Sequence, residues 1–296
     1  MYGIKRIVNG LSFSLLVAAG VACGTQAYAA PISQPYNDDF TGYNNGDAPA
    51  NATVHANAYD GVENTFNIQG DAMRWDIQVD SQPPASNPIG SAAWQVTNMD
   101  AGSLSSFTVS TTLNLVSQSA SAGNKEALPG LVLFGENLTG IEGSASHGAG
   151  NNFYWATYQV YGLGNQVGNI GRMQISGGGQ STLSGTFAFD SNNDYTLTVH
   201  GTYNELGHLT LEYTVSDGVT TSSVLSFTDT TPLTGEYFGL RGRMSGGADT
   251  QGVVVDYHNF TVVPEPASLG LVALGSLMML SRRLRTRGGE LAHANG

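Results

Sequence analysis

Residues 193–227 read NDYTLTVHGTYNELGHLTLEYTVSDGVTTSSVLSF, and this stretch decides the fold. In two runs of it every second residue is apolar, and the apolar positions are Tyr195, Leu197 and Val199, then Leu209, Leu211, Tyr213 and Val215. A period of two is that of a β-strand with one buried and one solvated face. Asp217-Gly218 then predicts a tight type I′ hairpin into Val219–Phe227.

The same alternation recurs elsewhere in the chain. One row consists of Phe107, Val109, Thr111, Leu113 and Leu115, and a later row of Val253, Val255 and Tyr257. Segments rich in Gly and Asn separate these runs, and the central part of the sequence has no long apolar stripe at helical spacing. We therefore predict one all-β domain over residues 30–262, an antiparallel β-sandwich or jelly roll.

The first residues have the features of a secretory signal peptide. Two basic residues precede an apolar run from Leu11 to Ala22, and Ala27 and Ala29 stand where signal peptidase requires small residues. We predict that residues 1–29 form a signal helix, engage the Sec translocon and are removed after Ala29. Lipidation of Cys23 is the alternative. With cleavage after Ala29 the mature chain has no cysteine, and therefore no disulfide and no Cys-based metal site.

A second apolar segment lies near the C-terminus. Val263-Pro264-Glu265-Pro266 is followed by an uncharged run, Ala267–Leu280, and then by arginines that include Arg282 and Arg283. The run is shorter than the roughly 20 residues of a comfortable bilayer crossing, so it predicts a short transmembrane helix. The arginines place residues 288–296 in the cytoplasm by the positive-inside rule. The alternative is a buried or amphipathic terminal helix.

This order of motif, apolar run and basic cluster resembles the PEP-CTERM sorting signal, here residues 263–287. The resemblance implies export across the inner membrane, transient anchoring there, and processing by an exosortase. It then implies a final place at the cell surface or outside the cell.

Short motifs in the central domain carry a second resemblance. They are Asn37-Asp38-Asp39-Phe40 near the start, Tyr237-Phe238-Gly239-Leu240-Arg241 late in the chain, and Asp256-Tyr257-His258-Asn259-Phe260 at the close. This series resembles the concanavalin A-like (laminin-G/lectin/glucanase) jelly roll. The resemblance implies an early strand beside the closing strand, and a superfamily that includes lectins, glycosidases and structural modules.

Charge narrows the classes of partner and of activity. Between residues 30 and 263 the sequence has five basic residues against 14 Asp and 7 Glu, a net charge of about −16, which disfavours nucleic acid as a partner. Retaining glycosidases need two carboxyl groups about 5–5.5 Å apart, and no strand here carries acids at adjacent same-face positions. We therefore expect a non-enzymatic structural or glycan-interacting protein of the extracellular matrix. A divergent glycan-active hydrolase is the alternative.

Aromatic residues give the candidate site for an extracellular polysaccharide. Sugars stack on aromatic rings and bond to polar side chains, which here suggests Tyr154, Trp155, Tyr158 and Arg241. Aromatic side chains occupy both alternating rows of Phe153–Tyr161, so one row is a candidate wall of a groove. The alternative is that both rows are buried in a sandwich core.

Three aspartates are the candidate ligands for a metal ion. Asp38, Asp39 and Asp256 would converge if the first and last strands pair, and carboxylate oxygens are the ligands that Ca²⁺ prefers. The alternative is that Asp38 and Asp39 begin a strand and that Asp256 faces solvent or caps a turn.

Overall fold

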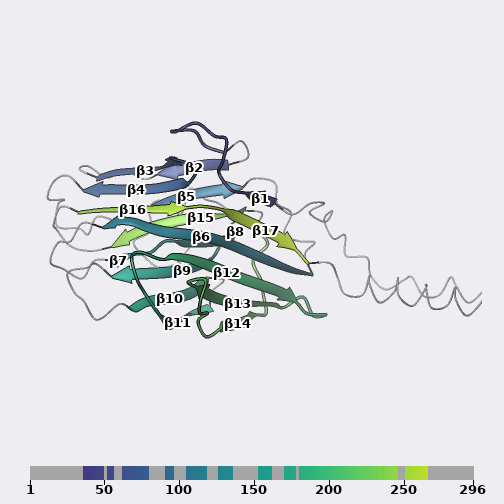
Figure 1. The fold of residues 1–296 in the computed structure, drawn as a ribbon. Helices are drawn as coiled ribbons and strands as arrows, with labels where there is room; N and C mark the ends of the chain where they lie inside the picture. The colour runs from purple at the N-terminus through teal and green to yellow at the C-terminus, as the bar shows by residue number, and fades with distance from the viewer. Residues whose placement is uncertain are drawn as a thin grey trace, which may run out of the picture.

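The computed structural model describes residues 36–49, 52–56, 62–79, 91–96, 105–118, 126–135, 153–161, 170–177, 180–235, 237–245 and 251–265. Within these ranges the chain forms two antiparallel β-sheets that face each other across a shared core (Figure 1). The all-β antiparallel sandwich predicted from the sequence is confirmed. The predicted signal helix and C-terminal transmembrane helix lie outside the described residues. Within those residues no helix combines the length and the apolar character that a bilayer crossing requires.

Nine strands form sheet A, in the order β14-β13-β12-β6-β16-β4-β3, with β17 joining β6 to β1. Their bounds are β1 Tyr36–Asp38, β3 Val62–Ile68, β4 Met73–Val79, β6 Ser106–Gln118, β12 Asp194–Tyr203, β13 Leu209–Ser216, β14 Leu225–Asp229, β16 Gln251–Tyr257 and β17 Phe260–Pro264.

Eight strands form sheet B, in the order β11-β10-β9-β7-β15-β5-β2, with β8 pairing both β15 and β9. Their bounds are β2 Ala52–Ala56, β5 Ser91–Val96, β7 Glu126–Ala127, β8 Gly130–Gly135, β9 Tyr154–Tyr161, β10 Ile170–Gly177, β11 Gln180–Ala188 and β15 Tyr237–Ser245.

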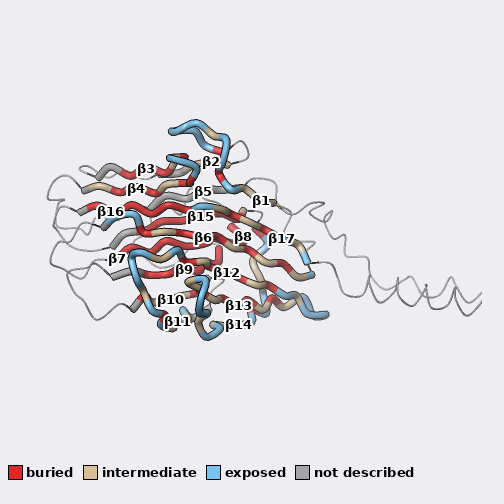
Figure 2. Tube along the Cα trace, in the orientation of Figure 1, coloured by how far each residue is buried: buried red, intermediate tan, exposed pale blue. Residues whose placement is uncertain are grey.

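The predicted alternation places the core correctly in sheet A. The apolar rows of β6, β12, β13 and β16 all point inward, and their residues are buried, while the residues between them along β12 and β13 are partly or fully exposed (Figure 2). Each of these strands contributes to one hydrophobic cluster that also takes side chains from β8, β9 and β15 of sheet B. The core therefore lies between the two sheets.

A glycine allows the sheets to approach each other closely. On β15 the inward positions are Phe238, Leu240 and Gly242. A Cβ atom on Gly242 would lie 2.0 Å from Cδ2 of Trp75, whose ring comes from β4 of the other sheet and is fully buried. The indole ring of Trp75 therefore occupies the space that a side chain at position 242 would take.

The hairpin after β13 differs from the prediction. Of its two central residues only Gly218 has a positive φ (83°), whereas a type I′ turn requires positive φ at both. Asp217 instead accepts hydrogen bonds from the backbone N–H groups of Val219 and Thr220, at 2.9 and 2.7 Å. Regular pairing resumes only at Leu225, opposite Tyr213. The prediction of a strand beginning at Val219 was therefore wrong.

Candidate functional site

The predicted calcium triad is not assembled. The first and last strands do pair, because Asp38 of β1 lies opposite Phe260 of β17. Asp256, however, belongs to the preceding strand β16, where it lies opposite Arg74 of β4. Its carboxylate accepts two hydrogen bonds of 2.6 Å from Nε and Nη2 of Arg74. Within the described ranges no group of three or more His, Cys, Asp or Glu side chains is arranged to hold a metal ion. Asp38, Asp39 and Asp256 therefore do not fit a shared Ca²⁺.

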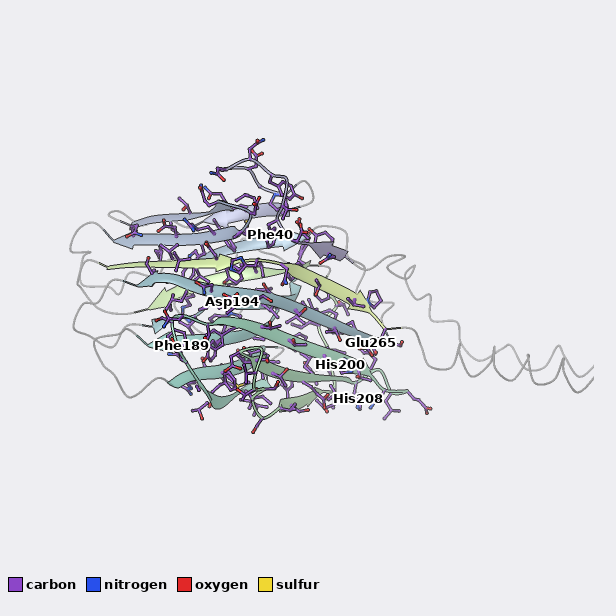
Figure 3. All side chains as sticks on the ribbon, in the orientation of Figure 1. Phe40, Phe189, Asp194, His200, His208 and Glu265 are labelled. Carbon is purple, nitrogen blue, oxygen red and sulfur yellow. The ribbon has the colours of Figure 1, made fainter. Side chains whose placement is uncertain are left out.

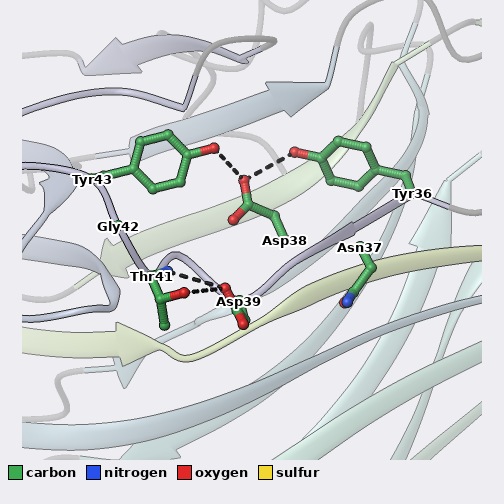
Figure 4. Close-up of a pocket in the computed structure, with 7 residues that line it drawn as sticks. All are labelled: Tyr36, Asn37, Asp38, Asp39, Thr41, Gly42 and Tyr43. Atoms are coloured by element: carbon green, nitrogen blue, oxygen red, sulfur yellow. Dashed lines mark hydrogen bonds between the residues drawn. The ribbon is translucent and has the colours of Figure 1, made fainter.

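Asp38 and Asp39 instead lie in a small pocket beside β1. The pocket has a volume of about 360 Å³ and is lined by Tyr36, Asn37, Asp38, Asp39, Thr41, Gly42 and Tyr43 (Figure 4). The rings of Tyr36 and Tyr43 stand on either side of the Asp38 carboxylate, and both phenols donate to its Oδ2, at 3.3 and 3.0 Å. The result is a polar hollow with two aromatic walls.

A tight reversal of the chain after β1 builds this pocket. Oδ1 of Asp38 accepts a hydrogen bond of 2.8 Å from the backbone N–H of Phe40. Phe40 has the unusual φ of 59°, and its side chain is fully buried. A non-glycine residue in this left-handed region is strained, so the buried ring and the Asp38 bond hold the chain in place. The reversal returns Tyr43 to the side of Tyr36.

The electrostatics of the pocket suit ligands that donate hydrogen bonds. Burial, and next the Asp38 charge, raise the pKa of Tyr36, so its phenol stays protonated at neutral pH. Hydrogen bonds from the side chain and then the backbone of Thr41 lower the pKa of Asp39, which therefore stays ionised. An ionised carboxylate accepts hydrogen bonds from hydroxyl groups and repels anions.

The predicted glycan residues divide between the two faces of sheet B. Tyr154 and Tyr158 point inward and are fully buried in the shared core. The Tyr154 hydroxyl donates to Oδ2 of buried Asp229 at 2.7 Å, and the Tyr158 hydroxyl donates to the carbonyl of Ala188 at 2.8 Å. Burial raises the pKa of both phenols. For these two tyrosines the core alternative holds, and neither ring is available to stack on a sugar.

Trp155 and Arg241 lie together on the outer face of sheet B. The Arg241 guanidinium carbon is 4.1 Å from the centre of the Trp155 ring and 5.2 Å from that of Phe153. Arg241 is only 2% exposed, and neither its Nε nor its Nη1 has a hydrogen-bond partner. Burial, and next the charge of Arg243, lower the pKa of Arg241 to about 9. The sequence analysis named both residues in one candidate set for sugar binding; the structure brings them together and buries both.

Glu265 of the predicted sorting motif is held by side chains of the adjacent strands β6 and β12 of sheet A. Its carboxylate accepts hydrogen bonds from Ser106 at 2.9 Å and Thr108 at 3.0 Å, and it lies 3.2 Å from Nδ1 of His200 (Figure 3). Its backbone N–H donates to the carbonyl of Ser106 at 2.9 Å. The Ser106 bond, followed by weaker contributions from Thr108 and His200, lowers the pKa of Glu265. Residues 263 and 264 of the motif are thus part of β17, and Glu265 packs against the same sheet.

Sequence reasoning did not find Tyr36 and Tyr43 as site residues. Aromatic residues at both ends of an Asn-Asp-Asp segment were the available signal. Their meeting at Asp38 depends on the left-handed turn at Phe40, and a phenylalanine gives no sign of such a turn.

Comparisons with known proteins found no matching protein-family model and no match among curated proteins. Among solved structures, the chain is similar to Lotus tetragonolobus seed lectin (11% identity, TM-score 0.47, 79% of this chain and 100% of that one). It is also similar to lectin II from Ulex europaeus (13%, 0.40, 78% and 99%). An endo-1,3-beta-glucanase from Streptomyces sioyaensis is a third (14%, 0.46, 79% and 98%). These are lectin and glucanase folds of the concanavalin A-like kind, but such low identities and TM-scores carry no argument about ligand or activity.

Proposed function

We propose that this protein is exported, processed by an exosortase, and binds neutral extracellular polysaccharide without cleaving it. The observation that carries the binding proposal is the pocket of Tyr36, Asp39 and Tyr43, which is polar, about 360 Å³ in volume and walled by two phenol rings. That volume lies within the roughly 300–1,000 Å³ of small-ligand sites. Sugar rings combine apolar faces with many hydroxyl donors, and the pocket offers an ionised carboxylate beside aromatic rings.

The negative charge of the pocket favours neutral glycans over acidic ones. Asp38 and Asp39 are adjacent in a body whose net charge is about −16, so an anionic sugar would be repelled. The Asp38 carboxylate accepts hydrogen bonds from Tyr36, Tyr43 and the backbone N–H of Phe40. Among the described hydrogen bonds, Asp39 accepts only those from Thr41, both at Oδ1. Asp39 is therefore the residue we expect to accept a sugar hydroxyl.

Binding is tested with a matched pair of carboxylate variants in the full-length protein. Asp39→Ala removes the proposed acceptor, and loss of one charged hydrogen bond of about 1.5–3 kcal/mol lowers affinity for a neutral polysaccharide about tenfold or more. Asp217→Ala is the control, because Asp217 is an exposed carboxylate that likewise caps a turn and has a lowered pKa. Equal affinities of the two variants on a glycan array and in titration would rule out the pocket.

The same samples separate binding from hydrolysis. In the pocket the Asp38 carboxylate is occupied by hydrogen bonds from Tyr36, Tyr43 and the backbone of Phe40, which leaves Asp39 as its one available carboxylate, whereas glycoside hydrolysis needs two. We expect saturable retention on polysaccharide with no reducing sugar released. Release of reducing sugar would favour the hydrolase.

The sorting part of the proposal rests on the sequence of residues 263–287. Glu265→Gln with Pro266→Ala is expected to leave unprocessed protein in the inner membrane, seen as a larger band in the membrane fraction. Ser106→Ala with Thr108→Val is the control, since it removes the contacts to Glu265 without changing the motif. Normal release of the motif variant would exclude exosortase processing.

A further inference from the structure

The first residues of the predicted sorting motif belong to the folded sheet. The last residues of β17 are Val263 and Pro264, and both pair with β6. Pro264 has no backbone N–H, but the next residue, Glu265, donates its own to the carbonyl of Ser106 on β6 at 2.9 Å. The backbone of the motif therefore follows β6 as far as Glu265.

Three side chains from two neighbouring strands hold the Glu265 carboxylate (Figure 3). Ser106 and Thr108 of β6 donate hydrogen bonds of 2.9 and 3.0 Å, and Nδ1 of His200 on β12 lies 3.2 Å from Oε1. The His200 ring is itself fixed, because Nδ1 lies 3.3 Å from the Thr108 hydroxyl and Nε2 lies 3.1 Å from the Thr202 hydroxyl. Chiefly the bond from Ser106 lowers the pKa of Glu265, so its carboxylate is ionised at neutral pH. The side chain is thus held by groups that are already in place.

Release of this segment does not require the sandwich core to open. Phe260 and Val262, which precede it in β17, are fully buried. Val263 is 41% exposed, and the side chain of Glu265 is 42% exposed. Partly exposed segments at the end of an element open locally at a lower free energy than the whole domain unfolds. Residues 263–265 can therefore detach from β6 while Val262 stays in the core.

The docked segment withholds the groups that a protease would bind. Extended peptides are recognised through their backbone hydrogen bonds and their side chains, and β6 already uses both at Glu265. Only Pro266 separates Glu265 from the uncharged run that begins at Ala267, and two residues span at most about 7 Å. While Glu265 is docked, little free chain is left between sheet A and the predicted transmembrane segment.

We propose that the docking of Glu265 on β6 and β12 restrains exosortase processing, which takes place only after residues 263–265 detach from the sheet. This inference rests on the processing proposed above and adds its regulation by the folded domain. When opening and reclosing are fast relative to cleavage, the rate of proteolysis follows the population of the open form. A change that weakens the Glu265 contacts and leaves the motif intact should therefore speed processing.

The test is a pulse–chase measurement of processing for Ser106→Ala with Thr108→Val, here called the docking variant. It removes both hydroxyl donors to Glu265, and water replaces them only in part. We expect processing about three- to tenfold faster than in the wild type. Thr210→Val with Thr228→Val is the control, because it removes a bonded hydroxyl pair from β13 and β14, which β12 and β6 separate from β17. The control should be processed at the wild-type rate.

Hydrogen exchange of the Glu265 amide measures the opening itself. The sample is the full-length precursor from cells that lack the exosortase. Because this amide bonds to the carbonyl of Ser106, it should be protected in the wild type and in the control. In the docking variant it should exchange faster, by a factor similar to the gain in processing rate.

Three results would overturn this proposal. Wild-type processing of the docking variant, whatever its hydrogen exchange, would show that detachment does not limit the reaction. Slower processing would mean that the exosortase recognises the docked form. Equal acceleration in the control would assign the effect to a general loss of stability. Failure of the exosortase proposal is seen separately, as normal release of Glu265→Gln with Pro266→Ala, whether or not the Glu265 amide is protected in the wild type.

Discussion

The Arg74–Asp256 pair offers the sharpest test of the sandwich, because it joins β4 to β16 through two hydrogen bonds of 2.6 Å. The Asp256 side chain is 11% exposed and the Arg74 side chain 32%. Removing one partner of a fully buried pair costs about 3–5 kcal/mol, whereas an exposed pair contributes about 0–1 kcal/mol. Arg74 is about a third exposed and regains water when its partner is lost. We therefore expect Asp256→Ala to destabilise the domain by about 1–3 kcal/mol.

The assay is a double-mutant cycle of Asp256→Ala and Arg74→Met, followed by thermal and urea denaturation. A domain of this size shifts by about 2–4 °C per kcal/mol, so Asp256→Ala should melt about 2–12 °C lower than the wild type. Arg74→Met retains most of the apolar stem that packs on the sheet, so the coupling energy reports the charged contact. Glu212→Ala is the control, because Glu212 is an exposed carboxylate on β13 of the same sheet.

Two results would refute this reasoning. A coupling energy near zero would mean that the two side chains do not stabilise each other. A melting temperature that falls in chelator for the wild type but not for Asp256→Ala would restore the calcium hypothesis, because an ion bound only by the native state stabilises it.

Three further variants test other parts of the structure. Tyr154→Phe removes the hydrogen bond to Oδ2 of buried Asp229, whose Oδ1 still accepts from Thr231, and should cost about 1–3 kcal/mol in urea denaturation while glycan affinity stays unchanged; reduced affinity in a stable variant would contradict the core assignment. Gly242→Ala forces a methyl group against the Trp75 ring, and calorimetry should show about 1–3 kcal/mol of destabilisation or more. Glu265→Gln should melt below the wild type at neutral pH. This difference in melting temperature should shrink as pH falls below about 4.5, because the contacts that lower the pKa of Glu265 stabilise the fold only while its carboxyl group is ionised. A difference that stays constant with pH would exclude the contact.

The sequence predicted those parts of the fold in which one strand face is polar. In β13 the residues that alternate with the apolar row Leu209–Val215 are Thr or Glu, so the pattern indicates which face is buried. In β9 the residues from Tyr154 to Gln159 are buried on both faces, and the polar residues Thr157 and Gln159 are buried as well, so polarity does not mark the outer row. For that reason the sequence left both rows of β9 open as candidates. Only the pairing of β9 with β8 and β10 determines that Tyr154 faces the core and Trp155 does not.

The site residues were harder to predict because their partners are distant in the chain. Asp256 and Arg74 are 182 residues apart, and the sequence around either residue does not indicate that the other is its partner. The assumption that the closing strand carries Asp256 failed by one strand, since the chain turns between Tyr257 and Phe260. Short motifs indicate that acids lie near the first and last strands, but the register decides which of them meet.

The two outer faces of the sandwich differ in how many of their polar groups have hydrogen-bond partners. On sheet A, hydroxyl groups of neighbouring strands bond to one another, as Ser110 does to Thr261 at 2.6 Å and Thr112 to Thr196 at 3.1 Å. Arg74 has its acid on the same sheet. On sheet B, Arg241 is more deeply buried than any of these groups and still lacks an acceptor for two of its nitrogen atoms. Sheet A thus satisfies its partly buried hydroxyl groups, whereas the two unbonded nitrogen atoms of buried Arg241 oppose folding.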